Sequence, residues 1–101
     1  MGRNSYLLLG TQKAMQETFG SACHGAGRLK SRTAAARSVR PDMLLKELES
    51  KGIIVKVSGR NTLVEEAPSA YKDVNDVVDV VHNAGIARRL CRMRPVGVIK
   101  G

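Results

Sequence analysis

The chain has 101 residues, a length that fits one small domain, and 43% of them are hydrophobic, enough for a modest core. Its net charge of +8 and isoelectric point near 10.1 favour a polyanionic partner or substrate, although a solvated basic face explains the same composition. Two cysteines outside any C-x-x-C pair exclude a disulfide framework, and the sequence shows neither a signal peptide nor a membrane-spanning apolar run, so we expect a soluble, cytoplasmic protein.

The first third of the chain predicts a strand, a helix and a loop. The apolar run Tyr6–Leu9 is typical of a buried strand. Thr11 can cap a helix over residues 12–18. Residues 21–32 combine Ser, Gly and basic residues without apolar periodicity, so a loop is expected there, and a short helix is expected over Ala34–Arg37.

The middle of the chain predicts a helix followed by a hairpin. Pro41 suits a first helical turn, the leucines that follow fall on one helical face, and Gly52 can end the helix. Residues 53–57 are β-branched and predict a strand. A turn at 58–61 then leads to an expected returning strand at 62–66.

The clearest helix is predicted over residues 73–84, where valines recur at i, i+3, i+4 and i+7, with Asp73 as its N-cap and Gly85 as its stop. Tyr71 would then lie just outside the helix, where its side chain can face a ligand. Residues 95–101 predict a short apolar strand. Together these elements predict a mixed α+β fold.

The basic residues are concentrated in the first part of the chain. Residues 1–60 hold 11 Lys and Arg against 4 Asp and Glu, whereas residues 61–101 hold 6 against 5. The excess therefore surrounds the segment 23-CHGAGR-28, whose histidine stands beside glycines and a cysteine.

Two generic interpretations of this segment are weak. A P-loop would need Lys and Ser/Thr where Ala26 and Gly27 stand. A zinc site is disfavoured because adjacent Cys and His rarely bind one ion together and the cysteine spacing matches no known zinc knuckle. Such a site would have to use Cys23, His24, His82 and Cys91.

A third interpretation is a nucleophilic or acid/base histidine, against the plain alternative of a surface histidine. A neutral imidazole is a competent nucleophile near physiological pH, as His24 would need to be. Gly25 and Gly27 would let backbone N–H groups approach a phosphate closely. Arg28 and Arg32 could balance the charge of phosphoryl oxygens. The residues alone leave these alternatives open.

Longer segments carry a resemblance that covers essentially the whole chain. They are 4-NSYLLLGT-11, 15-MQETFGSACHGAGRLKSR-32, 65-EEAPSAYKDV-74, 80-VVHNAGIARR-89 and 94-RPVGVIKG-101. In these segments, and in their order, the chain resembles the C-terminal part of the RtcB family of tRNA-splicing RNA ligases. The resemblance implies a C-terminal portion of the larger RtcB-type fold.

The resemblance implies a GTP-dependent, manganese-using RNA ligase of tRNA splicing and RNA repair. Such an enzyme joins a 2′,3′-cyclic phosphate or 3′-phosphate RNA end to a 5′-hydroxyl end. His24 would attack the α-phosphorus of GTP, expel pyrophosphate and become guanylylated. The GMP would pass to the RNA 3′-phosphate, and the 5′-hydroxyl would then displace it.

Individual site residues follow from the same resemblance. The implied nucleotide-binding residues are Ser5, His24, Gly25, Ala26, Gly27, Tyr71 and Lys100. Arg28 and Arg32 are implied for RNA phosphates. Without the resemblance, Ser5 would be read as a solvent-facing residue, Tyr71 as a core residue and Lys100 as part of a frayed terminus.

The manganese ligands of the family lie upstream of the region that matches, and no residue of this chain is assigned to metal. Residues 1–101 are therefore expected to be a single C-terminal segment without the metal-binding portion: a fragment, a subunit of a split enzyme, or an isolated C-terminal piece. We expect the chain alone to be inactive and to need RNA and the missing N-terminal portion as partners. The alternative is a non-catalytic basic module, derived from such a ligase, that binds RNA or protein.

Overall fold

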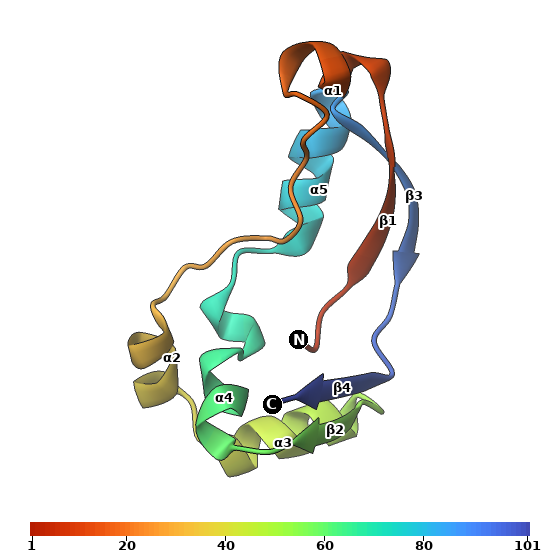
Figure 1. The fold of residues 1–101 in the computed structure, drawn as a ribbon. Helices are drawn as coiled ribbons and strands as arrows, with labels where there is room; N and C mark the ends of the chain where they lie inside the picture. The colour runs from red at the N-terminus through yellow and green to blue at the C-terminus, as the bar shows by residue number, and fades with distance from the viewer. The chain divides into compact units, whose positions relative to one another are not determined.

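A computed structural model describes all 101 residues, and the chain folds into two compact units built from segments distant in sequence (Figure 1). Unit 1 comprises Met1–Arg3, Arg28–Tyr71 and Pro95–Gly101, and unit 2 comprises Asn4–Gly27 and Lys72–Arg94. Since the chain passes repeatedly between the units, neither is one continuous stretch. Helices and short strands are both present along the chain, so the predicted mixed α+β class is confirmed. None of the helices has the length and apolar character needed to cross a membrane.

Unit 2 is built on a two-stranded antiparallel sheet with a helix on one face. Strand β1 (Ser5–Gly10) pairs with β3 (Ala87–Met93), and helix α5 (Val74–Asn83) packs against β3 (Figure 1). The side chains of Asn4 and Tyr6 both donate hydrogen bonds to Asn75 Oδ1 on α5. Even-numbered β1 residues such as Tyr6 therefore face the helix.

The prediction of a strand at the N-terminus is confirmed, but the prediction that it is buried is wrong. Leu7 and Leu9 are 53% and 49% exposed. Successive side chains of a strand point to opposite faces of a sheet, and Tyr6 occupies the face that α5 covers. The apolar run thus has only one face to bury within this chain, so Leu7 and Leu9 lie on the uncovered face.

The first helix, α1 (Gln12–Glu17), has the predicted cap. Thr11 Oγ1 accepts a hydrogen bond from Ala14 N at 3.2 Å and donates one to Gly85 O at 2.6 Å. The same hydroxyl therefore starts α1 and holds it to the chain just after α5. Gly85 has a φ of 75°, so the glycine predicted to end α5 supplies the left-handed residue that this turn requires.

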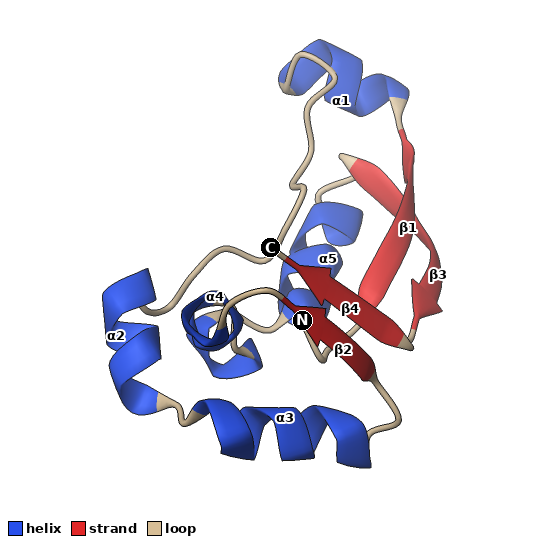
Figure 2. Ribbon diagram, turned by 60° about the horizontal axis from the view of Figure 1, so that its bottom comes forward, coloured by secondary structure: helices blue, strands red, loops and turns tan.

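Unit 1 packs three helices and two parallel strands around a leucine-rich core. Its helices are α2 (Arg32–Ser38), α3 (Pro41–Ser50) and α4 (Arg60–Glu65), and strand β2 (Ile54–Val57) lies beside β4 (Gly97–Lys100) (Figure 2). The buried core consists of Leu44, Leu48, Ile53, Leu63, Val64 and Ala67. The helix from Pro41 and the strands near 53–57 and 95–101 are confirmed.

The returning strand predicted at residues 62–66 is wrong, because this stretch lies in helix α4 and the residue that caps it. A hairpin would have placed the stretch beside β2, but the terminal strand β4 takes that place in a parallel pairing. Helical geometry instead buries Leu63 and Val64 together in the core. A run this short has no period that separates helix from strand, so the tertiary packing decides.

Other differences are smaller. Helix α2 begins at Arg32, within the predicted loop, and Ser31 Oγ accepts the capping hydrogen bond from Ala34 N at 3.1 Å. A short 3-10 helix, η1 (Pro68–Ala70), precedes Tyr71. No element was predicted for β3, where three arginines hide the alternation of a strand.

Candidate functional site

One carboxylate in unit 1 collects four of the residues implied for nucleotide and RNA phosphate. The Tyr71 hydroxyl donates a hydrogen bond to Glu66 Oε2, and Lys100 Nζ lies 4.0 Å from the same oxygen. Arg28 Nη1 and Arg32 Nε lie 3.4 Å and 3.9 Å from Glu66 Oε1. We call these five residues the Glu66 cluster.

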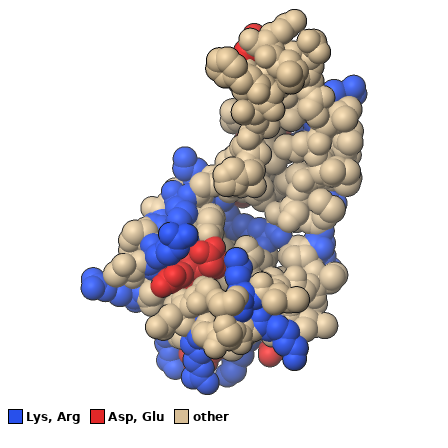
Figure 3. Space-filling view, in the orientation of Figure 1, with Lys and Arg blue, Asp and Glu red and all other residues tan.

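Local structure places each member of the cluster. Glu66 caps the C-terminal end of α4, and Tyr71 directly follows η1. Arg28 forms an isolated antiparallel bridge with Tyr71, supported by a 2.8 Å hydrogen bond from Leu29 N to Ala70 O. Arg32 begins α2 and Lys100 ends β4. Basic, acidic and aromatic side chains from four segments thus meet, and Figure 3 shows acidic side chains among Lys and Arg on unit 1.

The guanidinium of Arg28 is occupied by the chain itself. Its Nε donates to Lys30 O at 2.9 Å, Nη1 donates to Tyr71 Oη at 2.8 Å, and Nη2 donates to Glu65 O. The guanidinium carbon also lies 4.7 Å from the centre of the Tyr71 ring, a cation–π distance. Only 22% of this side chain is exposed. Arg28 therefore links the members of the cluster to one another, and few of its donors remain for a ligand.

Arg32 differs from Arg28 in what its guanidinium touches. Its side chain is 69% exposed, and the 3.9 Å approach to Glu66 is its one ion pair. Five N–H donors on a planar fork suit a phosphate, and most of those of Arg32 face solvent. Of the two arginines implied for RNA phosphates, Arg32 is the one whose donors are accessible.

Two pKa values in the cluster are shifted in opposite directions by the same hydrogen bond. The hydrogen bond from Tyr71 lowers the pKa of Glu66 below its ordinary value, and Lys100 and Arg28 lower it further against the cost of partial burial. The hydrogen bond to Glu66, together with partial burial, raises the pKa of Tyr71. At neutral pH the carboxylate is therefore charged and the phenol neutral.

His24 and Ser5 belong to unit 2 and have no such network. The His24 side chain is exposed and makes no hydrogen bond or ion pair within the chain. Gly27 has a φ of 76°, which favours glycine, and a Cβ at either Gly25 or Gly27 would meet open space. Ser5 is exposed on β1. The implied nucleotide-binding residues are thus divided between the units, with Tyr71 and Lys100 in unit 1.

The chain forms no metal centre from its own ligands. No group of three or more His, Cys, Asp or Glu side chains gathers in it, so the zinc site considered above does not form. His82 has a structural partner instead, because its Nδ1 accepts a 3.0 Å hydrogen bond from Arg89 N on β3. The same finding means that these residues do not fit a manganese site.

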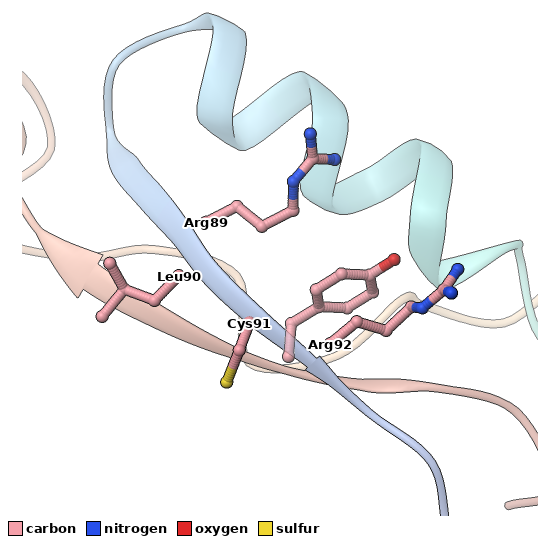
Figure 4. A pocket seen from close by; sticks show the side chains of 5 residues that line it. Arg89, Leu90, Cys91 and Arg92 are labelled. Atoms are coloured by element: carbon pink, nitrogen blue, oxygen red, sulfur yellow. The ribbon is translucent and has the colours of Figure 1, made fainter.

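Unit 2 also has a shallow cavity of about 260 Å³ beside β3, lined by Tyr6, Arg89, Leu90, Cys91 and Arg92 (Figure 4). The side chains of Arg89 and Arg92 extend toward the helix, and Arg89 pairs there with Asp79. Cys91 points the other way. None of the residues implied for nucleotide or RNA lines this cavity.

Comparison with known proteins gives the family. The family model described as "tRNA-splicing ligase RtcB" matches residues 1–101, the entire chain. The chain belongs to the RtcB family. It is 56% identical over 101 residues to the tRNA-splicing ligases RtcB of Archaeoglobus fulgidus and Thermococcus kodakarensis, and 55% identical to that of Pyrococcus horikoshii. The RtcB resemblance inferred from the five segments is confirmed.

The match covers all of this chain but only part of each RtcB relative. The chain spans 21% of the Archaeoglobus and Thermococcus proteins and 12% of the Pyrococcus horikoshii protein. The prediction that the fold is a portion of a larger RtcB fold is therefore confirmed.

Sequence reasoning missed Glu66 as a member of the site. Its signal lies in the segment 65-EEAPSAYKDV-74, from which the sequence-based prediction takes Tyr71 but not Glu66 as a site residue. A carboxylate in a chain of net charge +8 is expected to pair with cations, but the adjacent Glu65 carries the same signal, so the sequence does not single out Glu66.

Proposed function

We propose that this chain is part of a GTP-dependent RNA ligase that joins 2′,3′-cyclic phosphate or 3′-phosphate RNA ends to 5′-hydroxyl ends. The observation that carries the proposal is the RtcB match over all 101 residues, which includes 23-CHGAGR-28. The relatives are named tRNA-splicing ligases, which supports RNA as the substrate. The basic charge of the chain agrees with such a substrate.

In this proposal His24 is the nucleophile. A neutral ring nitrogen of His24 attacks the α-phosphorus of GTP, the new N–P bond forms, and the bond to pyrophosphate breaks. An oxygen of the RNA 3′-phosphate then takes the GMP and frees the imidazole. The 5′-hydroxyl oxygen finally attacks the 3′-phosphorus and GMP leaves. The exposed His24 side chain, free of internal hydrogen bonds, supports this role.

The remaining residues bind and orient. We assign the guanine and the GMP phosphate to Ser5, Tyr71, Lys100 and the backbone of Gly25, Ala26 and Gly27. Lys100 and Arg32 bring positive charge, and the accessible fork of Arg32 suits the RNA 3′-phosphate. Manganese would polarise the phosphates, and we place its ligands outside these residues because none gather here.

The proposal includes the rest of an RtcB polypeptide, in the same or a separate chain, as a partner. The uncovered face of the β1–β3 sheet supports this, since Leu7, Leu9 and Met93 are 53%, 49% and 44% exposed. Leu7 pairs with Cys91, and Ser5 pairs with Met93, so these side chains share one face. Contiguous exposed apolar side chains mark a surface to which other protein binds. The relatives have several times the length of this chain, so their remaining residues could supply that protein.

A non-catalytic basic module is the competing proposal. It rests on unit 1, which holds eleven Lys and Arg against five Asp and Glu, a net charge of +6. Such a module would bind RNA through the basic side chains of Figure 3 and would not need His24.

The two proposals are separated by transfer of GMP to His24. The chain is mixed with the upstream portion of the Archaeoglobus relative, GTP labelled at the α-phosphate, and manganese, and the labelled residue is mapped. We expect a label on His24 that His24→Ala abolishes while RNA binding is retained; His82 is the only other histidine. An unlabelled mixture would overturn the ligase proposal. Strong labelling of the chain alone would overturn the need for a partner.

A further inference from the structure

The Glu66 carboxylate uses both of its oxygens on residues that the proposed function assigns to ligands. Oε1 faces Arg28 and Arg32, and Oε2 accepts from Tyr71 and faces Lys100. The Glu66 side chain is only 19% exposed, whereas those of Lys100 and Arg32 are 35% and 69% exposed, so a ligand reaches these two cations more readily than it reaches the carboxylate. Glu66 is therefore placed to hold the contacting residues and not to contact the ligand itself.

The hydroxyl of Tyr71 is committed to the cluster. It donates its proton to Glu66 and accepts a 2.8 Å hydrogen bond from Arg28, which leaves at most one lone pair for anything else. The Arg28 guanidinium also lies over the ring, 4.7 Å from its centre. What Tyr71 can offer a planar base is thus its ring, from the side that Arg28 does not occupy.

Charge explains why a carboxylate is needed at this point. Arg28, Arg32 and Lys100 approach one another around Glu66, and three like charges without it would separate their side chains. With Glu66 ionised the four charged side chains keep a net charge of +2. The cluster can therefore remain assembled and still attract an anionic ligand.

We propose that Glu66 is a positioning residue of the nucleotide site, whose carboxylate fixes the Tyr71 ring and the Lys100 ammonium in the orientation that receives the guanine nucleotide. This inference rests on the proposed function. Glu66 acts through Tyr71 and Lys100, and Arg28 completes the frame.

The first test measures the cluster without any activity. Tyr6→Phe leaves Tyr71 as the only tyrosine, and the chain has no tryptophan, so phenolate absorbance in a pH titration reports Tyr71 alone. We expect its pKa to lie above the ordinary value of 10.0 and to fall when Glu66→Gln is added. Glu65→Gln is the matched control, because that neighbouring side chain makes no hydrogen bond or ion pair. Circular dichroism at each pH verifies that the chain stays folded. An unchanged Tyr71 pKa in Glu66→Gln would overturn the proposal.

The second test uses the reconstituted pair and the rate of guanylylation of His24. Glu66→Gln is expected to raise the KM for GTP about tenfold, the effect of losing one charge-assisted hydrogen bond. The kcat is expected to stay within about twofold, whereas a merely structural defect lowers the active fraction and leaves the KM unchanged. Glu65→Gln should match the unmodified chain in both constants.

A double-mutant cycle provides the second variant. Tyr71→Phe removes the hydroxyl that Glu66 holds, so Glu66→Gln combined with Tyr71→Phe should raise the KM no more than the larger single effect. Additive effects, or a Glu66→Gln KM equal to that of Glu65→Gln, would overturn the inference. If the unmodified pair does not label His24, the proposed function fails instead, and the tyrosine titration still reports whether Glu66 holds Tyr71.

Discussion

The two units contribute to the candidate site in different ways. In unit 1, Tyr71 and Arg28 are held by hydrogen bonds to each other and to Glu66. In unit 2, His24 is exposed on a glycine-containing loop and has no partner of its own. The part that would bind a base is thus organised by this chain, whereas the proposed nucleophile lacks any group that orients it. The orientation of His24 therefore depends on a ligand or on protein outside this chain.

The largest expected effect is on His24. Replacing it with alanine should lower guanylylation in the reconstituted pair by at least about 10³-fold, because no other group can form the phosphoramidate. Since the side chain holds no internal contact, the unfolding midpoint of the chain should not change. A large loss of stability in His24→Ala would contradict this expectation, because it would show that unit 2 does hold this residue in place.

The next largest effect is a difference in stability between variants of the two arginines of the Glu66 cluster. Arg28→Ala should lower the free energy of unfolding by about 2 kcal/mol, since it removes the donor from three acceptors, two of them in partly buried hydrogen bonds, and one of the cations beside the Glu66 carboxylate. Arg32→Ala, the matched control, should cost less than about 0.5 kcal/mol, because its single ion pair is long and exposed. Urea denaturation of both variants measures this.

In an RNA-binding assay, Arg32→Ala should have the larger effect of the two arginine variants. Arg32→Ala is expected to weaken binding of a 3′-phosphate end in the reconstituted pair about tenfold, the loss of one charge-assisted contact. If Arg28→Ala and Arg32→Ala lost equal stability, the proposal that Arg28 stabilises the Glu66 cluster while Arg32 contacts RNA would be wrong.

A smaller effect is expected from the uncovered face of unit 2. Leu7→Ser combined with Leu9→Ser should weaken assembly with the upstream portion by about tenfold or more, because each leucine buried at the interface contributes about 1.5–3 kcal/mol when fully desolvated. The free chain should lose little stability, since both side chains are exposed. Val80→Ser is the control, an exposed apolar residue of α5 on the other side of this unit. Titration of the labelled chain with its partner measures the affinity, and an equal loss in Val80→Ser would show that the sheet face is not special.

Local signals in the sequence predicted much of this structure, and contacts between distant segments account for what they missed. Thr11 and Asp73 were found as caps because each bonds to a residue two or three positions away. The stretch at 62–66 was misjudged because β2 pairs with a strand from the far end of the chain. Glu66 was missed for a similar reason, since the cations that pair with it, Arg28, Arg32 and Lys100, are distant in sequence and only Tyr71 is nearby. The exposure of Leu7 and Leu9 was missed because a run of apolar residues does not show which face of a strand its own chain covers.

The smallest expected effect is the pH dependence that Glu66 gives to unit 1. The Tyr71 hydrogen bond keeps the pKa of Glu66 in the folded chain below its ordinary value of 4.5, so around that pH the unfolded chain binds more protons. The stabilisation is thus complete above pH 4.5 and is lost as the pH falls from there through the folded-state pKa. Glu66→Gln removes the titrating group, so its unfolding free energy should decline less over this range than that of Glu65→Gln. Urea denaturation at pH 6 and at a series of values below 4.5 measures the two declines, and parallel curves would mean that the carboxylate is not held by the hydroxyl in solution.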